Sequence, residues 1–155
     1  MRNILLIDDH AVVRKGLKSI LEEEFIDITV NEAGTGLDGI NQIQACQPEA
    51  VVLDISLPDI NGLEVLKRIR MDWPKLPVLI LSVYGEDQYG VRVMRSGASG
   101  YLAKSSAPEL LVTALKKLIG GQKYISPELA ERLAFNPLKS PDDLSVECLS
   151  DREYQ

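Results

Sequence analysis

Residues 50–55, AVVLDI, are apolar except for one carboxylate, Asp54. The segment VLILSV, residues 78–83, has the same character and carries one hydroxyl, Ser82. A strand with one face in water alternates apolar and polar residues, whereas a strand that helices cover on both faces is apolar almost throughout. The two segments therefore predict central strands, within 49–55 and 76–83, of a parallel sheet.

Strand-like and helix-like segments alternate on both sides of this centre. Three further short apolar runs lie at 3–8, 26–33 and 100–104. Apolar residues that share one helical face separate the runs: Val13, Leu17, Ile20 and Leu21, then Leu63, Leu66 and Ile69, then Leu111, Ala114, Leu115 and Leu118. The segment 87–97 is the weakest of these helices because Gly90 lies inside it. Right-handed crossovers between such elements predict an α/β fold with an open, doubly wound sheet.

Composition limits the classes of function. The 155 residues suffice for one domain and a short appendage, and 45% hydrophobic with 26% charged residues is typical of a globular protein. Two separated cysteines, Cys46 and Cys148, favour neither a disulfide framework nor a zinc site. A net charge of −6 argues against nucleic-acid binding by this segment itself. Because neither a signal peptide nor a membrane-length apolar stretch is present, we expect a cytoplasmic protein without membrane contact.

Charged and polar residues stand where the predicted strands end. Asp8 and Asp9 close the first strand, Asp54 the third and Ser82 the fourth, while Lys104 lies just past the fifth. Parallel α/β sheets bind ligands at the carboxyl ends of their strands. Three carboxylates packed there would raise one another's pKa, and a hard cation such as Mg²⁺ would relieve their repulsion. The sequence therefore predicts a Mg²⁺ site at this edge.

Four separated motifs carry a family resemblance: IDDH (7–10), LDISLPDINGLEVL (53–66), LILSVYG (79–85) and GASGYLAKSS (97–106). Together they resemble the receiver domain of bacterial two-component response regulators, over roughly residues 1–120. The resemblance implies a flavodoxin-like (βα)5 fold with five parallel strands in the order 2-1-3-4-5.

The residues after the receiver segment resemble the NarL/FixJ subfamily. YISPELAERL (124–133) is similar to its linker helix, with Ser126 as the N-cap, and LSDREYQ (149–155) to the first turns of its LuxR-type helix-turn-helix domain. We therefore expect a receiver domain over 1–120, a linker with a short helix over 121–147, and over 148–155 the start of a truncated DNA-binding domain.

The resemblance also implies roles for the residues at the strand ends. Asp54 would accept a phosphoryl group from a sensor histidine kinase, with Lys104 and Mg²⁺ supplying positive charge. Asp9, Asp54 and the backbone carbonyl of Ser56 would coordinate the metal, and Asp8 would act largely through water.

Ser82 and Tyr101 resemble the switch pair of the family, with the Ser82 hydroxyl donating to the phosphoryl group and Tyr101 rotating into the vacated space. The implied protein is a signalling domain rather than an enzyme. It would form a homodimer on phosphorylation and regulate transcription through DNA contacts of the missing domain.

Three other functions are open from the residues alone. A Mg²⁺-dependent phosphatase of similar architecture would need a second carboxylate two residues after Asp54, where Ser56 stands. A flavin or nucleotide binder would need a glycine-rich loop after the first strand, which is absent. An inert interaction module would not need the carboxylates, the hydroxyl and the lysine of the pocket, all of which are present.

Isolated residues receive plainer interpretations. His10, the only histidine, is expected to face solvent or to start a helix rather than to bind metal, because no second histidine supports it. Asp59 is expected to be a loop residue, Asn61 to lie near a helix cap, and Trp73 to cover a helix end.

Overall fold

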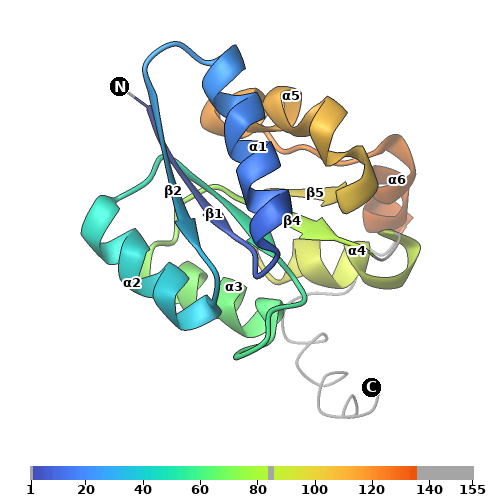
Figure 1. Cartoon of the computed structure of the whole chain (residues 1–155). Coiled ribbons are helices and arrows are strands. Elements are labelled where there is room, and N and C mark those ends of the chain that lie inside the picture. The colour runs from blue at the N-terminus through green and yellow to red at the C-terminus, as the bar shows by residue number, and fades with distance from the viewer. Residues whose placement is uncertain (1, 84–85, 136–155) are drawn as a thin grey trace. The chain divides into compact units, whose positions relative to one another are not determined.

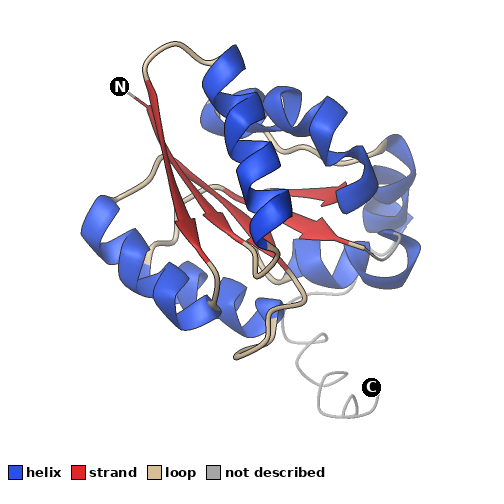
Figure 2. Cartoon of the chain, in the orientation of Figure 1, coloured by secondary structure: helices blue, strands red, loops and turns tan. Residues whose placement is uncertain are grey.

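A computed structural model describes residues 2–83 and 86–135 of the chain (Figures 1 and 2). It divides into a unit over 1–125 and a second unit from 126 onward. In chain order the elements are β1 (Arg2–Ile7), α1 (Ala11–Glu24), β2 (Ile28–Ala33), α2 (Gly36–Cys46), β3 (Ala50–Asp54), α3 (Gly62–Asp72), β4 (Val78–Ser82), α4 (Glu86–Arg95), β5 (Gly100–Ala103), a 3₁₀ turn (Lys104–Ser106), α5 (Ala107–Ile119) and α6 (Pro127–Phe135).

The first unit is built on a five-stranded parallel sheet. Its strand order is β2-β1-β3-β4-β5, which confirms the predicted doubly wound topology. Helices α1 and α5 cover one face of the sheet, and α2, α3 and α4 cover the other (Figures 1 and 2). In register, Ile7 lies beside Leu53 and Asp54 beside Leu81. The strands therefore end together at one edge.

The two central strands are buried at every position, as their unbroken apolar sequences predict. Successive side chains point to opposite faces of a strand. One face of β1, β3 and β4 accordingly packs in a single cluster with α1 and α5, and its members include Ile4, Leu6, Val52, Leu79, Leu81, Leu17, Leu21, Leu111 and Leu115. Burying one leucine or isoleucine side chain contributes about 1.5–3 kcal/mol, so this layered core holds the strand ends in place.

Helix α2 lies in a segment for which the sequence analysis identifies no apolar face. The structure gives the reason: two of its buried positions, Gly36 and Gly39, are glycines. A Cβ atom at Gly39 would lie 2.5 Å from the Ile7 side chain. At Gly39, helix α2 therefore lies so close to β1 that a glycine stands where an amphipathic helix would ordinarily carry an apolar side chain.

The second unit contains α6 within its described residues. The Ser126 Oγ accepts a hydrogen bond from the Leu129 N–H at 3.0 Å, which confirms the predicted N-cap. The remainder of the expected linker and the expected start of a DNA-binding domain, residues 136–155, lie outside the described residues. None of the helices in the described part of the chain is long and apolar enough to cross a membrane.

Candidate functional site

Three side chains from three different strand ends meet at the carboxyl edge of the sheet. Asp8 follows β1, Asp54 ends β3 and Lys104 follows β5. The Lys104 Nζ lies 2.9 Å from Asp54 Oδ2 and 3.2 Å from Asp8 Oδ2. The exposed fractions of the Asp54 and Asp8 side chains are only 1% and 3%, and that of Lys104 is 12%. One largely buried ammonium group thus lies between two buried carboxylates.

Asp54 is held by contacts at both of its oxygens. The Ser56 N–H donates to Oδ1 at 3.0 Å, and Lys104 donates to Oδ2. Burial raises the pKa of the Asp54 carboxyl, and the Asp8 charge adds to the rise, although the Ser56 and Lys104 donors oppose it. Burial alone would lower the pKa of Lys104, but Asp54 and Asp8 outweigh it and the pKa of Lys104 is raised. At Asp54, burial and the neighbouring Asp8 charge therefore outweigh the two donors.

Asp8 keeps one oxygen without a hydrogen bond. Its Oδ1 accepts from the His10 backbone N–H at 2.8 Å and from Lys104 at 3.4 Å. Its buried Oδ2 has no hydrogen-bond donor, because the ammonium at 3.2 Å is close enough for an ion pair but is not aligned for a hydrogen bond. A buried carboxylate oxygen without a donor is costly, so this atom is suited to a cation.

His10 meets its sequence-based expectation and makes further contacts with the acidic cluster. It does precede α1 as its N-cap residue, as expected, and 57% of its side chain is exposed. One edge of the ring, however, turns inward: Nδ1 lies 3.1 Å from Asp8 Oδ1, 3.2 Å from Asp9 Oδ1 and 3.1 Å from Lys104 Nζ. The position of His10 directly after Asp9 indicates this contact with the cluster, because any residue between the end of β1 and the start of α1 lies at the same edge of the sheet.

The cluster fits a divalent cation. Asp8, Asp9, His10 and Asp54 each offer one ligand atom, and these four atoms lie within 4.8 Å of one another. Carboxylate oxygens are the ligands that hard divalent cations prefer. The Asp8 oxygen without a hydrogen-bond donor agrees with this donor set.

Comparison with known proteins places the chain in a family. The family model of the response regulator receiver domain matches residues 4–116. The chain belongs to the response regulator receiver family. The response regulator UvrY of Escherichia coli (strain K12) is 35% identical over 156 residues, an alignment that takes in all of this chain and 72% of UvrY.

Two solved structures share the arrangement of this receiver domain. A LuxR-family two-component response regulator from Aurantimonas sp. SI85-9A1 is 30% identical, with a TM-score of 0.77 over 88% of this chain and 97% of that one. The isolated receiver domain of RcsB from Salmonella enterica, solved with the phosphomimetic BeF₃⁻, is 27% identical, with a TM-score of 0.74 over 85% and 97% of the two chains. The chain is thus a receiver domain of two-component signalling, of the kind found in transcription regulators.

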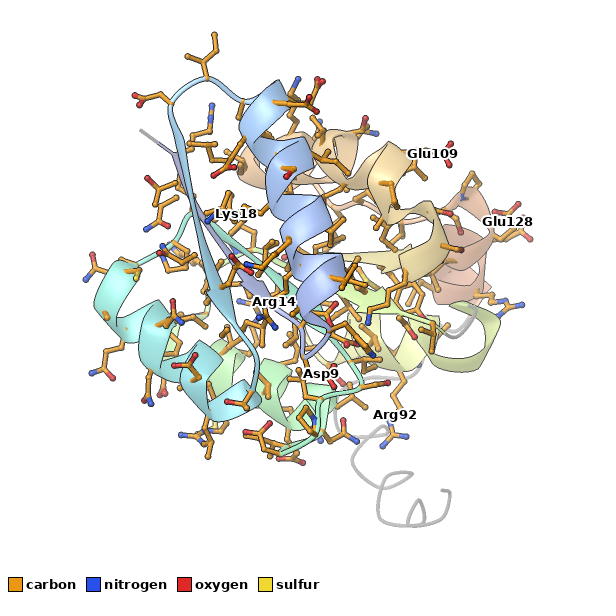
Figure 3. The ribbon with its side chains drawn as sticks, in the orientation of Figure 1. Asp9, Arg14, Lys18, Arg92, Glu109 and Glu128 are labelled. Carbon is orange, nitrogen blue, oxygen red and sulfur yellow. The ribbon has the colours of Figure 1, made fainter. Side chains whose placement is uncertain are left out.

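Arg14 ties the receiver domain's first helix to the site. Its Nε donates to Glu32 Oε1 at 3.0 Å, and its Nη1 donates to the backbone carbonyl oxygen of Asp8. Arg14 and Lys18 project from α1, while Asp9 lies beyond the end of β1 (Figure 3). Burial raises the pKa of Glu32, but the Arg14 hydrogen bond and the charges of Lys15 and Lys18 outweigh it, so the pKa lies below its ordinary value. The network fixes the backbone that carries the acidic pair.

Asp59 lies in the loop between β3 and α3, as expected, and also makes contacts with α2. Its Oδ1 accepts from the Gly36 N–H at 2.8 Å, and its Oδ2 accepts from the Leu37 N–H at 3.0 Å. The Gly36 bond, with the Leu37 bond, holds the pKa of Asp59 below its ordinary value against a smaller effect of burial. A carboxylate from the loop after Asp54 thus caps α2, an interaction between distant segments that no local pattern predicts.

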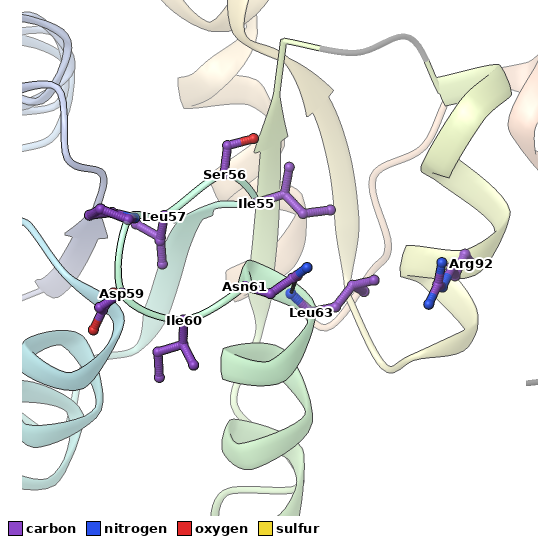
Figure 4. A pocket seen from close by; sticks show the side chains of 9 residues that line it. Ile55, Ser56, Leu57, Asp59, Ile60, Asn61, Leu63 and Arg92 are labelled. Atoms are coloured by element: carbon purple, nitrogen blue, oxygen red, sulfur yellow. Dashed lines mark hydrogen bonds between the residues drawn. The ribbon is translucent and has the colours of Figure 1, made fainter. Parts of the chain in front are cut away.

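The loop between β3 and α3 also borders a pocket of about 500 Å³ (Figure 4). Ile55, Ser56 and Asn61 line it from the loop side, and Arg92 faces them from α4 (Figure 4). Asn61 is the N-cap of α3, as predicted, and accepts from the Leu63 N–H at 2.7 Å.

The structure places the expected switch residues on β4 and β5. Ser82 ends β4 at the same edge as Asp54 and is fully buried. Tyr101 pairs with Ile80, and only 3% of its surface is exposed. The rotation of Tyr101 on activation stays a prediction.

Proposed function

We propose that this receiver domain accepts a phosphoryl group on Asp54 from a sensor histidine kinase, and that the modification controls transcription through a DNA-binding domain. The contact that supports this most directly is the 2.9 Å ion pair between Lys104 and the buried Asp54. A nucleophilic carboxylate beside a fixed cation is the arrangement that phosphoryl transfer requires, because the reaction depends on positioning and charge.

Each residue has a definite task in the transfer. An Asp54 oxygen attacks phosphorus while the bond from phosphorus to the donor's histidine nitrogen breaks and the imidazole leaves. The Ser56 N–H keeps Oδ1 fixed at 3.0 Å, which orients the carboxylate. Lys104, already beside Oδ2, offsets the charge of the phosphoryl oxygens.

Asp9, Asp54 and the Ser56 carbonyl would hold Mg²⁺, and Asp8 would act through a bound water. Bound Mg²⁺ would supply positive charge beside the phosphoryl oxygens. Ser56 provides no second carboxylate two residues after Asp54, so the site is better suited to accepting a phosphoryl group than to phosphatase turnover.

The switch requires more than one contact. A phosphoryl group adds about −1.5 to −2 charges, and a hydrogen bond to it from Ser82 contributes roughly 1.5–3 kcal/mol. Moving a two-state equilibrium from 1:99 to 99:1 needs about 5.5 kcal/mol. We therefore propose that Lys104 shares this task with Ser82, that Tyr101 reports the change on the α4–β5 face, and that dimerisation follows.

Intact-mass spectrometry after incubation with acetyl phosphate and Mg²⁺ tests the proposal. The wild type should gain one phosphoryl adduct, and Asp54→Ala and a chelated sample should gain none. Asp72→Ala, which removes an exposed carboxylate at the end of α3, is the matched control and should keep the adduct. An adduct that persists in Asp54→Ala would reject Asp54 as the acceptor.

The remaining domains and partners belong to the same proposal. The receiver over 1–120 would act through a linker over 121–147 on a DNA-binding domain that starts at 148–155. The relative UvrY is a longer response regulator, of which this chain covers 72%, and this supports the proposed organisation. Sedimentation of the receiver with and without BeF₃⁻ tests the dimer, and an unchanged monomer in both samples would reject it.

A further inference from the structure

We infer that His10 Nδ1 is a protein ligand of the divalent cation, so that the site binds borderline metals such as Zn²⁺ and Co²⁺ more tightly than its carboxylates alone would. The inference rests on the proposed function only in placing a cation at this cluster. It adds a nitrogen ligand to a site otherwise described by oxygen atoms.

The contacts of Nδ1 suit neither protonation form of the free ring completely. A nitrogen that carries a proton can donate to Asp8 Oδ1 at 3.1 Å or to Asp9 Oδ1 at 3.2 Å, but then it faces the Lys104 ammonium, another donor, at 3.1 Å. A nitrogen without a proton can accept from Lys104, but then its lone pair faces two carboxylate oxygens. Neither form satisfies all three contacts. With a divalent cation bound, the lone pair of an unprotonated Nδ1 would face the cation together with the carboxylate oxygens, and the Lys104 ammonium would give up its contact with Nδ1 and keep its ion pairs with Asp8 and Asp54.

The distances also match a coordination shell. With metal–ligand bonds of about 2.1 Å, adjacent ligand atoms of an octahedron lie about 3.0 Å apart and opposite ones about 4.2 Å apart. Nδ1 lies 3.2 Å from Asp9 Oδ1 and 4.0 Å from Asp54 Oδ2, the oxygens of the two carboxylates that are proposed to bind the metal directly. The ring therefore already occupies a corner of such a shell before any cation binds.

Two anchors keep the imidazole at this corner. The His10 backbone N–H donates to Asp8 Oδ1 at 2.8 Å, which fixes its backbone beside a carboxylate of the cluster. Helix α1 begins at the next residue, and Arg14 in its first turns donates to the Asp8 carbonyl. The outer edge of the ring remains in solvent, with 57% of the side chain exposed, so the metal can be reached from outside.

A nitrogen ligand changes which metals the site favours. Imidazole binds Zn²⁺, Co²⁺ and Ni²⁺ well, whereas Mg²⁺ prefers oxygen and releases its water reluctantly. Loss of His10 should therefore weaken binding of Zn²⁺ and Co²⁺ much more than binding of Mg²⁺. The ratio of the affinities, rather than either affinity alone, is diagnostic of direct nitrogen coordination.

The single histidine of the chain makes a direct test possible. In ¹⁵N-labelled wild-type protein, the imidazole nitrogen signals can belong only to His10, so Zn²⁺ at thiols such as Cys46 leaves them unchanged. Titration with Zn²⁺ should shift the Nδ1 signal in the manner of a coordinated nitrogen, with saturation at one equivalent for this site. An Nδ1 signal that retains its metal-free position when the carboxylates are saturated would overturn the inference.

Calorimetric affinities give a second, independent readout. His10→Ala should lower the affinity for Zn²⁺ and Co²⁺ by about 10-fold or more, on the scale of lost ligand interactions, and should change the affinity for Mg²⁺ by less than about 2-fold. His10→Asn, which offers an oxygen in place of the nitrogen, should give the same metal preference as His10→Ala. Tighter binding of all three metals by His10→Ala would instead identify the ring as a competitor of the cation and would overturn the inference.

These outcomes separate the inference from the proposed function. If wild-type protein gains the phosphoryl adduct with Mg²⁺ but Nδ1 does not respond to Zn²⁺, the inference fails and the proposed function stands. If Nδ1 responds to Zn²⁺ but no adduct forms, the metal ligand stands and phosphoryl acceptance fails.

Discussion

The substitution Gly62→Ala should slow phosphorylation without touching a charged group. Gly62 is the first residue of α3, and its N–H donates to the Ile55 carbonyl oxygen at 3.0 Å. A Cβ atom at this position would lie 2.4 Å from Ile55 Cα and 2.7 and 2.8 Å from the Ile55 carbonyl oxygen and carbon. The obstacle is backbone, which cannot rotate away as a side chain can.

The geometry sets the size of the effect. Carbon atoms in contact lie about 3.5–4.0 Å apart, so relieving the 2.4 Å approach requires a separation of roughly 1 Å between α3 and the loop. Strain of this kind costs about 1–3 kcal/mol of stability. Ile55 stands between Asp54 and Ser56, and a misplacement of about 1 Å at a reacting group can reduce a rate by about 100-fold.

The assay is the rate of adduct formation from acetyl phosphate by mass spectrometry, together with thermal unfolding. Gly16→Ala is the matched control, because a Cβ there meets nothing within 4 Å and the position is exposed in α1. This control should gain about 0.5–1 kcal/mol of stability from helix propensity and keep the wild-type rate. Wild-type rate and stability in Gly62→Ala would refute the reasoning from close packing.

Three further outcomes follow from contacts around the site. Glu32→Gln should destabilise the fold by about 1 kcal/mol at pH 7. Because the folded pKa of Glu32 is lowered from 4.5, this contribution to stability is present above that pH and is lost as the pH falls. The free energies of chemical unfolding of the variant and the wild type should therefore converge in acid. Asp59→Ala should increase amide hydrogen exchange at Gly36 and Leu37, whose N–H groups lose their acceptor, and unchanged exchange would contradict the cap. Arg70→Met should cost about 1–3 kcal/mol in urea unfolding, because Arg70 donates to the carbonyl oxygens of Gly97, Trp73 and Pro74, and a neutral result would show that water replaces it.

The elements that the sequence predicts well are those whose signals are local. The unbroken apolar segments before Asp54 and Ser82 identify buried parallel strands. The carboxyl ends of parallel strands all lie at the same edge of a sheet. The same reasoning predicts that Lys104, which follows the fifth strand, lies near Asp54 at the end of the third. The order of the strands, by contrast, is predicted only by the family resemblance, because the pattern of apolar and polar residues within one strand does not show which other strand it pairs with.

The features that the sequence missed depend on packing between distant segments. Asp59 caps α2 from a loop more than twenty positions away, so its partner is invisible to a local pattern. Gly36 and Gly39 conceal a buried helical face because a neighbouring element occupies the space of their side chains. The expectation for His10 rests on the absence of a second histidine. The surroundings of its ring are instead set by the carboxylates that precede it and by Asp54, which lies near it only in the folded chain.

The charge of the site explains why cation binding and phosphorylation would have different consequences. The carboxylates of Asp8, Asp9 and Asp54, with the ammonium of Lys104, leave two negative charges unbalanced, and a divalent cation offsets them. In the proposed function, phosphorylation then replaces one carboxylate charge with about −1.5 to −2. The loaded site again lacks positive charge, and a further donor at this edge is the buried hydroxyl of Ser82, at the end of the strand beside Asp54. A conformational response should therefore follow the phosphoryl group and not the cation, because only the former recreates the imbalance that draws donors inward.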